Sequence, residues 1–155
     1  QDLKNNLIIK ESKKNKIEPT LLAAMITIES NWNHKAVSKA KACGLTQILP
    51  KYTGRITKKY TCKQLKNPRI SIAAGAKILR WWIDYHKGKL TKKQRKKMSP
   101  DNIKNHAISR GLCGYNAGFR CAGKKPTRHG MRYSRKVVKL QKRIQALAYQ
   151  KSLSL

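Results

Sequence analysis

Acidic side chains are scarce in this sequence. It has six Asp and Glu residues against 37 Lys and Arg residues, which gives a formal net charge of +31 at pH 7. Such a chain attracts polyanions: nucleic acid, anionic lipid, teichoic acid, lipopolysaccharide or the acidic peptides of a cell wall. Enrichment of lysine on solvated faces by an AT-rich genome is the alternative explanation for much of the excess. The charge alone therefore selects no partner.

Long hydrophobic runs are also absent. The longest apolar-rich stretch, LLAAMITI at 21–28, is too short to cross a bilayer. Apolar residues nevertheless make up 39% of the 155 positions and are spread along the chain, which excludes a disordered basic tail. No alternating pattern is long enough to predict a strand. We therefore predict one mainly α domain over residues 1–155, large enough to bury a core.

The four cysteines lack the CxxC spacing that is typical of zinc sites, so we expect no metal. An even number fits two disulfides in an exported protein, and three pairings are possible. The short separation of Cys113 and Cys121 favours a local bridge, which would leave Cys43 with Cys62. The alternative is four free thiols in a reducing compartment.

Hydrophobic periodicity, together with the positions of proline and glycine, predicts five clear helices. They lie at 3–14, 16–30 (starting near Pro19), 67–88, 101–118 and 131–149. Residues 44–60 are predicted to form a further helix with a kink or a late start near Pro50. We expect 67–88 to be the most buried helix and Asp101 to cap the next one. Residues 31–43, 88–100 and 119–130 are predicted to be irregular.

Glu29 ends the apolar helix predicted at 16–30. It follows Met25 by four residues and Leu22 by seven, so it shares their inward face. Burial disfavours the charged form of a carboxylate and raises its pKa, which suits a general acid. Taken alone, a core glutamate held by hydrogen bonds, or one paired with lysine, is the simpler explanation.

The residues that follow Glu29 resemble a known family. ESNWNHKAVSKAKACGLTQILP at 29–50 matches an E-S pair, an aromatic residue, and A-x-S-x-A-x-A-x-G-L-M-Q followed by proline. Residues 72–79 resemble a second block, YNAG at 115–118 is a third, and Tyr133 before the last helix is a fourth. The pattern resembles the soluble lytic transglycosylase (SLT) domain of glycoside hydrolase family 23, in the lysozyme-like superfamily. His34, Lys41 and Thr46 depart from the usual Pro, Gly and Met, and we expect Thr46 on the cleft wall.

The resemblance implies a lysozyme-like fold of the SLT and goose-type lysozyme kind, and a single-acid mechanism. Glu29 would protonate the β-1,4 bond between N-acetylmuramic acid and N-acetylglucosamine, and would then deprotonate the muramoyl C6 hydroxyl to close a 1,6-anhydro ring. The substrate's own acetamido group would stabilise the reacting centre. The scarcity of acids agrees with one carboxylate, since a second would have to be Asp84, Asp101 or one near the N-terminus.

The same resemblance implies roles for other residues, with no cofactor. Ser30 and Gln47 would line the cleft and bind sugar or acetamido groups. Tyr115 and Asn116 would hold the substrate, and Tyr133 would orient the acid. The expected partner is the peptidoglycan glycan strand, with anionic wall polymers or lipids as further candidates, and we expect a monomer without specific nucleic-acid binding. The expected location is extracytoplasmic: periplasmic, secreted or phage-associated.

Other functions remain open at this stage. Water in place of the C6 hydroxyl would make the protein a lysozyme-like hydrolase of the same bond. The charge also fits a basic nucleic-acid-binding module, although no groove-reading motif is present. The basic segment 88–100 and the last helix could instead disrupt anionic membranes without catalysis.

Overall fold

The computed structural model describes residues 2–154, and most of them are helical. The helices are α1 (Asp2–Asn15), α2 (Pro19–Ser30), α3 (Cys62–Leu65), α4 (Pro68–Lys89), α5 (Lys92–Lys96), α6 (Pro100–Ala117) and α7 (Arg128–Leu153), with 3-10 turns η1 (Pro50–Tyr52) and η2 (Gly118–Cys121). Across the described residues, β pairing is limited to isolated bridges that Cys43 makes with Val37 and Ile48. The prediction of a mainly α chain is confirmed.

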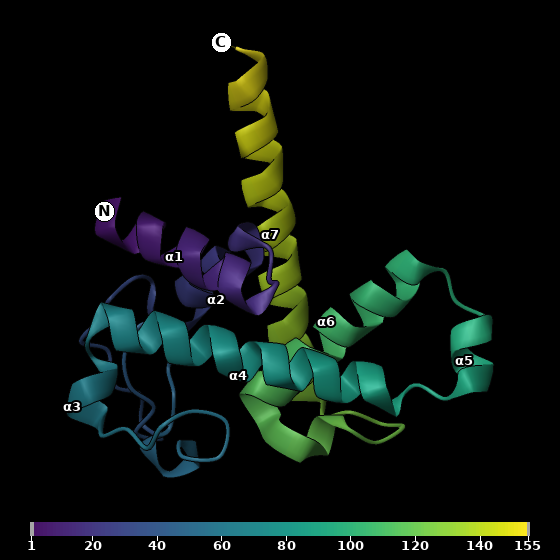
Figure 1. Ribbon diagram of the computed structural model, residues 1–155, viewed down its shortest axis with the longest axis horizontal. Helices are drawn as coiled ribbons and strands as arrows, with labels where there is room; N and C mark the ends of the chain where they lie inside the picture. Colours follow the sequence, from purple (N-terminus) through teal and green to yellow (C-terminus); the bar gives the residue numbers. More distant parts are fainter. Residues whose placement is uncertain (1, 155) are drawn as a thin grey trace. The chain divides into compact units, whose positions relative to one another are not determined.

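Two compact units make up the chain. The first contains the chain up to Ile78 and from Lys139 onward, and the second is Leu79–Val138. Helices α4 and α7 are continuous and each belongs partly to both units (Figure 1). The single-domain organisation stays a prediction, and the two units are described separately below. Within residues 2–154, no helix is both long and apolar enough to cross a membrane.

In the first unit, α1 packs against α2. Helix α2 begins with Pro19 in its first turn, where the missing N–H has no helical partner to lose. It ends at Ser30 and is capped by Asn31, whose φ of 45° is left-handed. Its buried side includes Leu22 and Met25, both fully inaccessible. The predicted helix and its inward face are confirmed.

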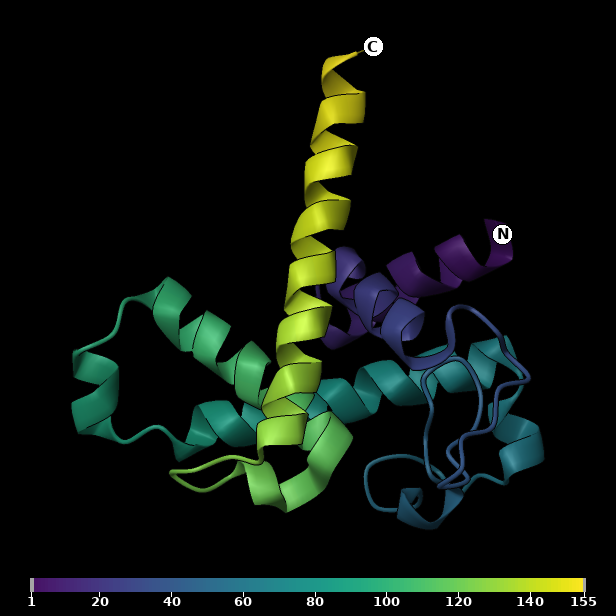
Figure 2. The ribbon, with the colours of Figure 1, turned by 180° about the vertical axis from the view of Figure 1, so that it is seen from behind.

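The segment between α2 and α4 winds through successive turns (Figure 2). We predicted a helix over 44–60, and this was wrong, because only Pro50–Tyr52 forms a short 3-10 turn there. The backbone at Gly44 and Gln47 has φ of 80° and 50°, in the left-handed region that a right-handed helix cannot include. A Cβ at Gly44 would lie 1.9 Å from the carbonyl oxygen of Leu65. Close packing against α3 therefore keeps this stretch in turns.

Two features stabilise that irregular segment. A disulfide joins Cys43 to Cys62, which confirms the expected pairing. Buried Cys43, Ile48, Leu65 and Ala74 form a small apolar core beneath the turns. Closing a loop of 19 residues with a disulfide stabilises the folded chain by about 3 kcal/mol.

Helix α4 confirms the prediction for 67–88, and it extends one residue further to Lys89. Its apolar stripe is buried as expected, with Ile72, Ala76, Leu79 and Ile83 between 0% and 4% exposed. Helix α3 was not predicted. Its start was encoded by a capping box, in which Thr61 and Gln64 bond each other's backbone N–H groups.

In the second unit, α6 packs against η2, and the Cys113–Cys121 disulfide joins them as expected. Gly111 and Gly114 allow α6 to approach α4 closely. A Cβ at Gly114 would lie 2.4 Å from the Trp82 ring, and one at Gly111 would lie 2.7 Å from the Ile83 side chain. Any larger residue would force the two helices apart.

Two details of the second unit differ from the prediction. The N-cap of α6 is Ser99, whose hydroxyl accepts from the N–H of Asn102, so Asp101 lies inside the first turn and does not cap the helix. Pro100 at the first helical position explains the shift, because proline is favoured there. The predicted basic loop 88–100 contains the short helix α5, which begins at a second capping box of Thr91 and Gln94.

Helix α7 is longer than predicted, running from Arg128 to Leu153. Val137 is fully buried, whereas Leu147 is 66% exposed. The last turns extend past the residues that cover the helix. The high helix propensity of Gln, Ala and Lys keeps these exposed turns helical.

Candidate functional site

Glu29 is the next-to-last residue of α2. Its side chain is half-buried, following the fully buried Met25 and Ile26 on the same helix. The carboxyl group thus lies at the edge of the core of the first unit. A position of this kind is sheltered and still within reach of a ligand, as a general acid requires.

The residue after Glu29 ties α2 to the turn at 44–47. Ser30 Oγ donates to the carbonyl oxygen of Leu45 across 2.9 Å, and it lies 3.3 Å from the carbonyl oxygen of Ile26 in its own helix. The hydroxyl therefore connects the helix end to a segment 15 residues away in the sequence. This bond fixes the turn next to the end of the helix that carries Glu29.

Gln47 lies at the end of that turn and is half-buried. Its side-chain Nε2 donates to the carbonyl oxygens of Gly44 at 2.9 Å and Ala36 at 3.2 Å. Its backbone φ of 50° is left-handed, which is uncommon for a residue with a side chain. The side-chain bonds hold Gln47 in this conformation, so its carboxamide has a defined position.

Thr46 was expected on the cleft wall, and this was wrong, because it is 0% exposed. Its hydroxyl donates to the carbonyl oxygen of Ser71 at 2.8 Å, and its N–H donates to Ser71 Oγ at 3.2 Å. Gly75, one turn later on α4, leaves room for the Thr46 methyl group. A Cβ at position 75 would lie only 2.5 Å from that methyl carbon. The small polar side chain at position 46 therefore faces into the protein, where Ser71 accepts the hydrogen bonds of its hydroxyl and its N–H.

Ser71 is a site-supporting residue that the sequence did not reveal. It is fully buried and binds the turn that carries Gln47 to the first turn of α4. Lys41, at the other end of the segment, has φ of 69° where glycine is usual in the resembling family. In the first unit, the Ser30 bond thus holds the turn that carries Gln47 at the end of α2, the helix of Glu29.

The other three predicted site residues belong to the second unit. Tyr115 is half-buried and Asn116 is exposed, both at the C-terminal end of α6. Tyr133 is buried on α7 at 8% exposure. Asn116 Oδ1 lies 2.7 Å from Nε2 of His129, which must therefore carry the hydrogen. His129 was missed in the sequence, because nothing in the loop before it indicated its contact with Asn116.

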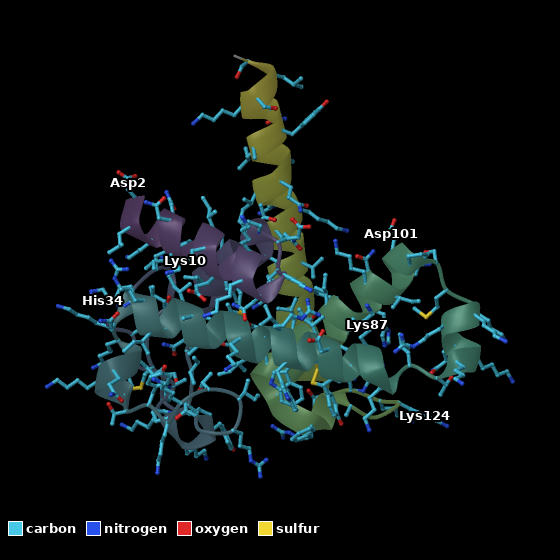
Figure 3. All side chains as sticks on the ribbon, in the orientation of Figure 1. Asp2, Lys10, His34, Lys87, Asp101 and Lys124 are labelled. Carbon is cyan, nitrogen blue, oxygen red and sulfur yellow. A yellow bond between two sulfur atoms is a disulfide. The ribbon has the colours of Figure 1, made fainter. Side chains whose placement is uncertain are left out.

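The other acidic residues occupy different settings. Asp84 pairs with Arg80 one turn earlier on α4 and is 64% exposed in its side chain. Asp101 is exposed at the start of α6, as is Asp2 at the start of α1 (Figure 3). Glu11 is buried on α1, and Glu18 is exposed before α2. Both carboxylates of the second unit therefore face solvent.

A buried histidine of the second unit has a perturbed pKa. His86 is 3% exposed and stacks on Trp82. Burial, together with the positive charges of Arg110, His106 and Lys89, lowers its pKa from 6.5 to about 4. Burial and Arg110 also lower the pKa of His106. Among residues 2–154, no group of three or more His, Cys, Asp or Glu side chains is arranged to hold a metal ion.

Comparison with known proteins adds two findings. The model of the family described as "Transglycosylase SLT domain" matches residues 6–138. The fold is also similar to the X-ray structure of an inactive mutant of the lytic transglycosylase Slt from Pseudomonas aeruginosa, in which a glutamate is replaced by glutamine, with a TM-score of 0.69 and 18% identity. That match covers 96% of this chain and 24% of the Pseudomonas protein, so the chain spans about a quarter of its length. The predicted lysozyme-like fold is confirmed.

Proposed function

Because this chain belongs to the transglycosylase SLT domain family, we propose that it cleaves the β-1,4 bond between N-acetylmuramic acid and N-acetylglucosamine in peptidoglycan. Family membership confirms the prediction of a transglycosylase-type enzyme at the level of the family. The substrate bond, the products and the residue roles below are our proposal. One observation carries it: Glu29 is half-buried at the end of α2, and Ser30 ties that helix end to the turn of Gln47.

In the proposed first step, Glu29 gives its proton to the glycosidic oxygen as the bond to the muramoyl C1 breaks. The oxygen leaves as the hydroxyl of N-acetylglucosamine, and the electron deficiency at C1 is shared with the muramoyl acetamido group. The mechanism requires that Glu29 carries a proton before this step.

In the second step, the ionised Glu29 takes the proton of the muramoyl C6 hydroxyl, and that oxygen bonds to C1. The product is a 1,6-anhydromuramoyl end, Glu29 regains its proton, and no water is consumed. One carboxylate serves as acid and then as base. The exposure of Asp84 and Asp101 supports a mechanism that does not use them.

The remaining residues bind and orient in this proposal. Gln47 presents a fixed carboxamide to the sugar, since its backbone bonds hold its side chain. Ser30 lines the cleft and also positions the turn through Leu45. Tyr115 and Asn116 hold the glycan near the reacting centre, and Tyr133 orients Glu29.

Product analysis tests the proposal. Digestion of purified peptidoglycan should release muropeptides with anhydro ends, which mass spectrometry separates from reducing ends by one water. The Glu29→Gln variant should fold normally and release none, since an amide cannot donate the proton. Reducing ends alone would identify a lysozyme-like hydrolase. Release that persists in the Glu29→Gln variant would refute the role of Glu29.

We further propose that the protein acts outside the cytoplasm as a monomer. Both cysteine pairs form disulfides, and structural disulfides persist in oxidising compartments. Peptidoglycan lies in the same surroundings. Periplasmic, secreted and phage-associated forms all fit this setting.

A further inference from the structure

Helix α7 carries a stripe of positive charge along one side. Its seven members are all exposed, and we call them the α7 basic stripe: Arg128, Arg132, Arg135, Lys136, Lys139, Lys142 and Arg143. At roughly 100° per residue they fall within an arc of about 120°, and no other residue of 128–143 falls inside that arc. One continuous helix fixes their spacing along a length of about 22 Å.

The stripe faces away from the protein. The residues of α7 that are buried, Gly130, Tyr133, Ser134 and Val137, lie on the opposite side of the helix. No Asp or Glu occurs anywhere in Arg128–Leu153, and none of the seven cations pairs with an acidic side chain among the described residues. Several cations follow each other at spacings of three and four, which destabilises a helix unless anions are nearby. The stripe is therefore suited to an external anionic partner.

General enrichment in lysine does not explain the stripe. Arginine makes up ten of the 37 Lys and Arg residues in the whole chain, but four of the seven on the stripe. Arginine offers a planar fork of donors that matches phosphate in two-point contacts, which lysine cannot make. Carboxylates also fit this fork, so the composition points to oxyanions such as phosphate groups.

The form of the stripe favours a linear polymer over a bilayer. A helix that lies in a membrane inserts an apolar face, but the apolar face of 128–143 is covered by the protein itself. Of the exposed apolar residues after the stripe, Tyr149 and Leu153 share one side of the helix, but Leu147 differs from Tyr149 by roughly 200°, so at most two large apolar side chains could enter a bilayer together. A flexible chain with regularly spaced phosphates can follow the stripe along its length.

We propose that the α7 basic stripe binds a linear phosphodiester polymer of the cell envelope, of the poly(glycerol phosphate) kind, and holds the enzyme along the wall. The choice of an envelope polymer over nucleic acid rests on the proposed function, because the glycan substrate lies beside such polymers. Binding at the stripe is separate from catalysis. It would retain the enzyme on an insoluble substrate between cleavage events.

Two variants that each lose three positive charges test the proposed binding. The first, Arg135→Gln/Lys139→Gln/Lys142→Gln, neutralises the centre of the stripe. The second, Lys92→Gln/Lys93→Gln/Lys96→Gln, removes the same charge from exposed positions of α5. Affinity for purified poly(glycerol phosphate) near physiological salt should fall at least about tenfold in the stripe variant and less than about threefold in the α5 variant. Equal losses would overturn the proposal, because net charge alone would then explain binding.

A charge-preserving variant, Arg135→Lys/Lys139→Arg/Lys142→Arg, should keep most of the polymer affinity, and circular dichroism should show unchanged helix content in all three. Vesicles of phosphatidylglycerol and phosphatidylcholine, and a short DNA duplex, are the competing probes. A stripe-dependent loss confined to vesicles or to DNA would overturn the choice of partner.

Catalysis is measured separately, on peptidoglycan stripped of phosphate polymers. The stripe variant should release muropeptides there at the normal rate. If the wild-type protein releases none, the proposed function fails while polymer binding by the stripe still stands.

Discussion

Ser30 donates a hydrogen bond to the carbonyl oxygen of Leu45 across 2.9 Å, which joins the end of α2 to the turn of Gln47. The two partners are 15 residues apart, and the intervening segment is irregular. This contact therefore holds the turn of Gln47 at the end of α2, the helix that carries the proposed acid. Its removal should affect chemistry more than folding.

Replacing Ser30 with alanine should lower the rate of muropeptide release several-fold and the free energy of unfolding by about 1 kcal/mol. The turn would lose its tie to α2 while the core beneath it is unchanged. Ser152→Ala is the matched control, since that hydroxyl also donates to a backbone carbonyl but at an exposed position of α7. Equal activity of Ser30→Ala and wild type would show that the bond does not position the site.

Two glycines of α4 should respond in opposite directions to alanine. Gly75→Ala would place a methyl group 2.5 Å from the Thr46 methyl, so we expect a loss of about 1–3 kcal/mol in the free energy of unfolding. Gly88→Ala meets nothing within 4 Å and should raise stability by about 0.5–1 kcal/mol. Urea denaturation of both variants measures the difference. A stable Gly75→Ala protein would mean that Thr46 can move aside.

His129 should influence substrate binding through Asn116. Its Nε2 donates to Asn116 Oδ1 at 2.7 Å, so His129→Ala frees the amide to rotate. The KM for a soluble glycan should rise several-fold while kcat changes less, and His129→Gln should restore part of the loss by supplying another donor. Lys124→Ala, an exposed change in the preceding loop, serves as control. A fall in kcat alone would argue against this positioning role.

Acid should destabilise the protein through His86. Its pKa is about 4 in the folded state and near 6.5 when unfolded, so the unfolded chain binds the extra proton between these values. The contribution of neutral His86 to the free energy of unfolding is fully present above pH 6.5. It is lost as the pH falls toward 4, and the loss reaches up to about 3 kcal/mol. His106 acts in the same direction.

The His86→Phe variant isolates that contribution, because phenylalanine can keep the stacking on Trp82 without titrating. Denaturation in urea should show a smaller loss of stability between neutral pH and about pH 4.5 in the variant than in wild type. Parallel pH profiles for the two proteins would assign the acid sensitivity to other groups.

Much of the fold was predictable because it depends on local sequence. Pro19 and Pro68 indicated helix starts, and the apolar spacing along α4 predicted a stripe that is buried. The cysteine pairing followed from the short separation of Cys113 and Cys121. These features depend on neighbours within a few turns of chain.

The errors arose where distant contacts decide the conformation. Apolar residues at 44–60 suggested a helix, but the left-handed Gly44 lies against Leu65 and the stretch forms turns. Thr46 was placed on the cleft wall by comparison with methionine, whereas Ser71 draws its hydroxyl inward. His129 and Ser71 could not be found from sequence, because their partners are 13 and 25 residues away. The roles of Glu29, Gln47 and Tyr133 stay predictions until tested.

The contact of Thr46 with Ser71 and Gly75 restricts how this domain can diverge. A methionine at position 46 would be larger than the threonine that packs against Gly75, and the buried carbonyl oxygen of Ser71 would lose its side-chain donor. Substitutions at these three contacting positions should therefore have non-additive effects on stability. Libraries that recombine this domain with its relatives should therefore exchange the three positions as a block.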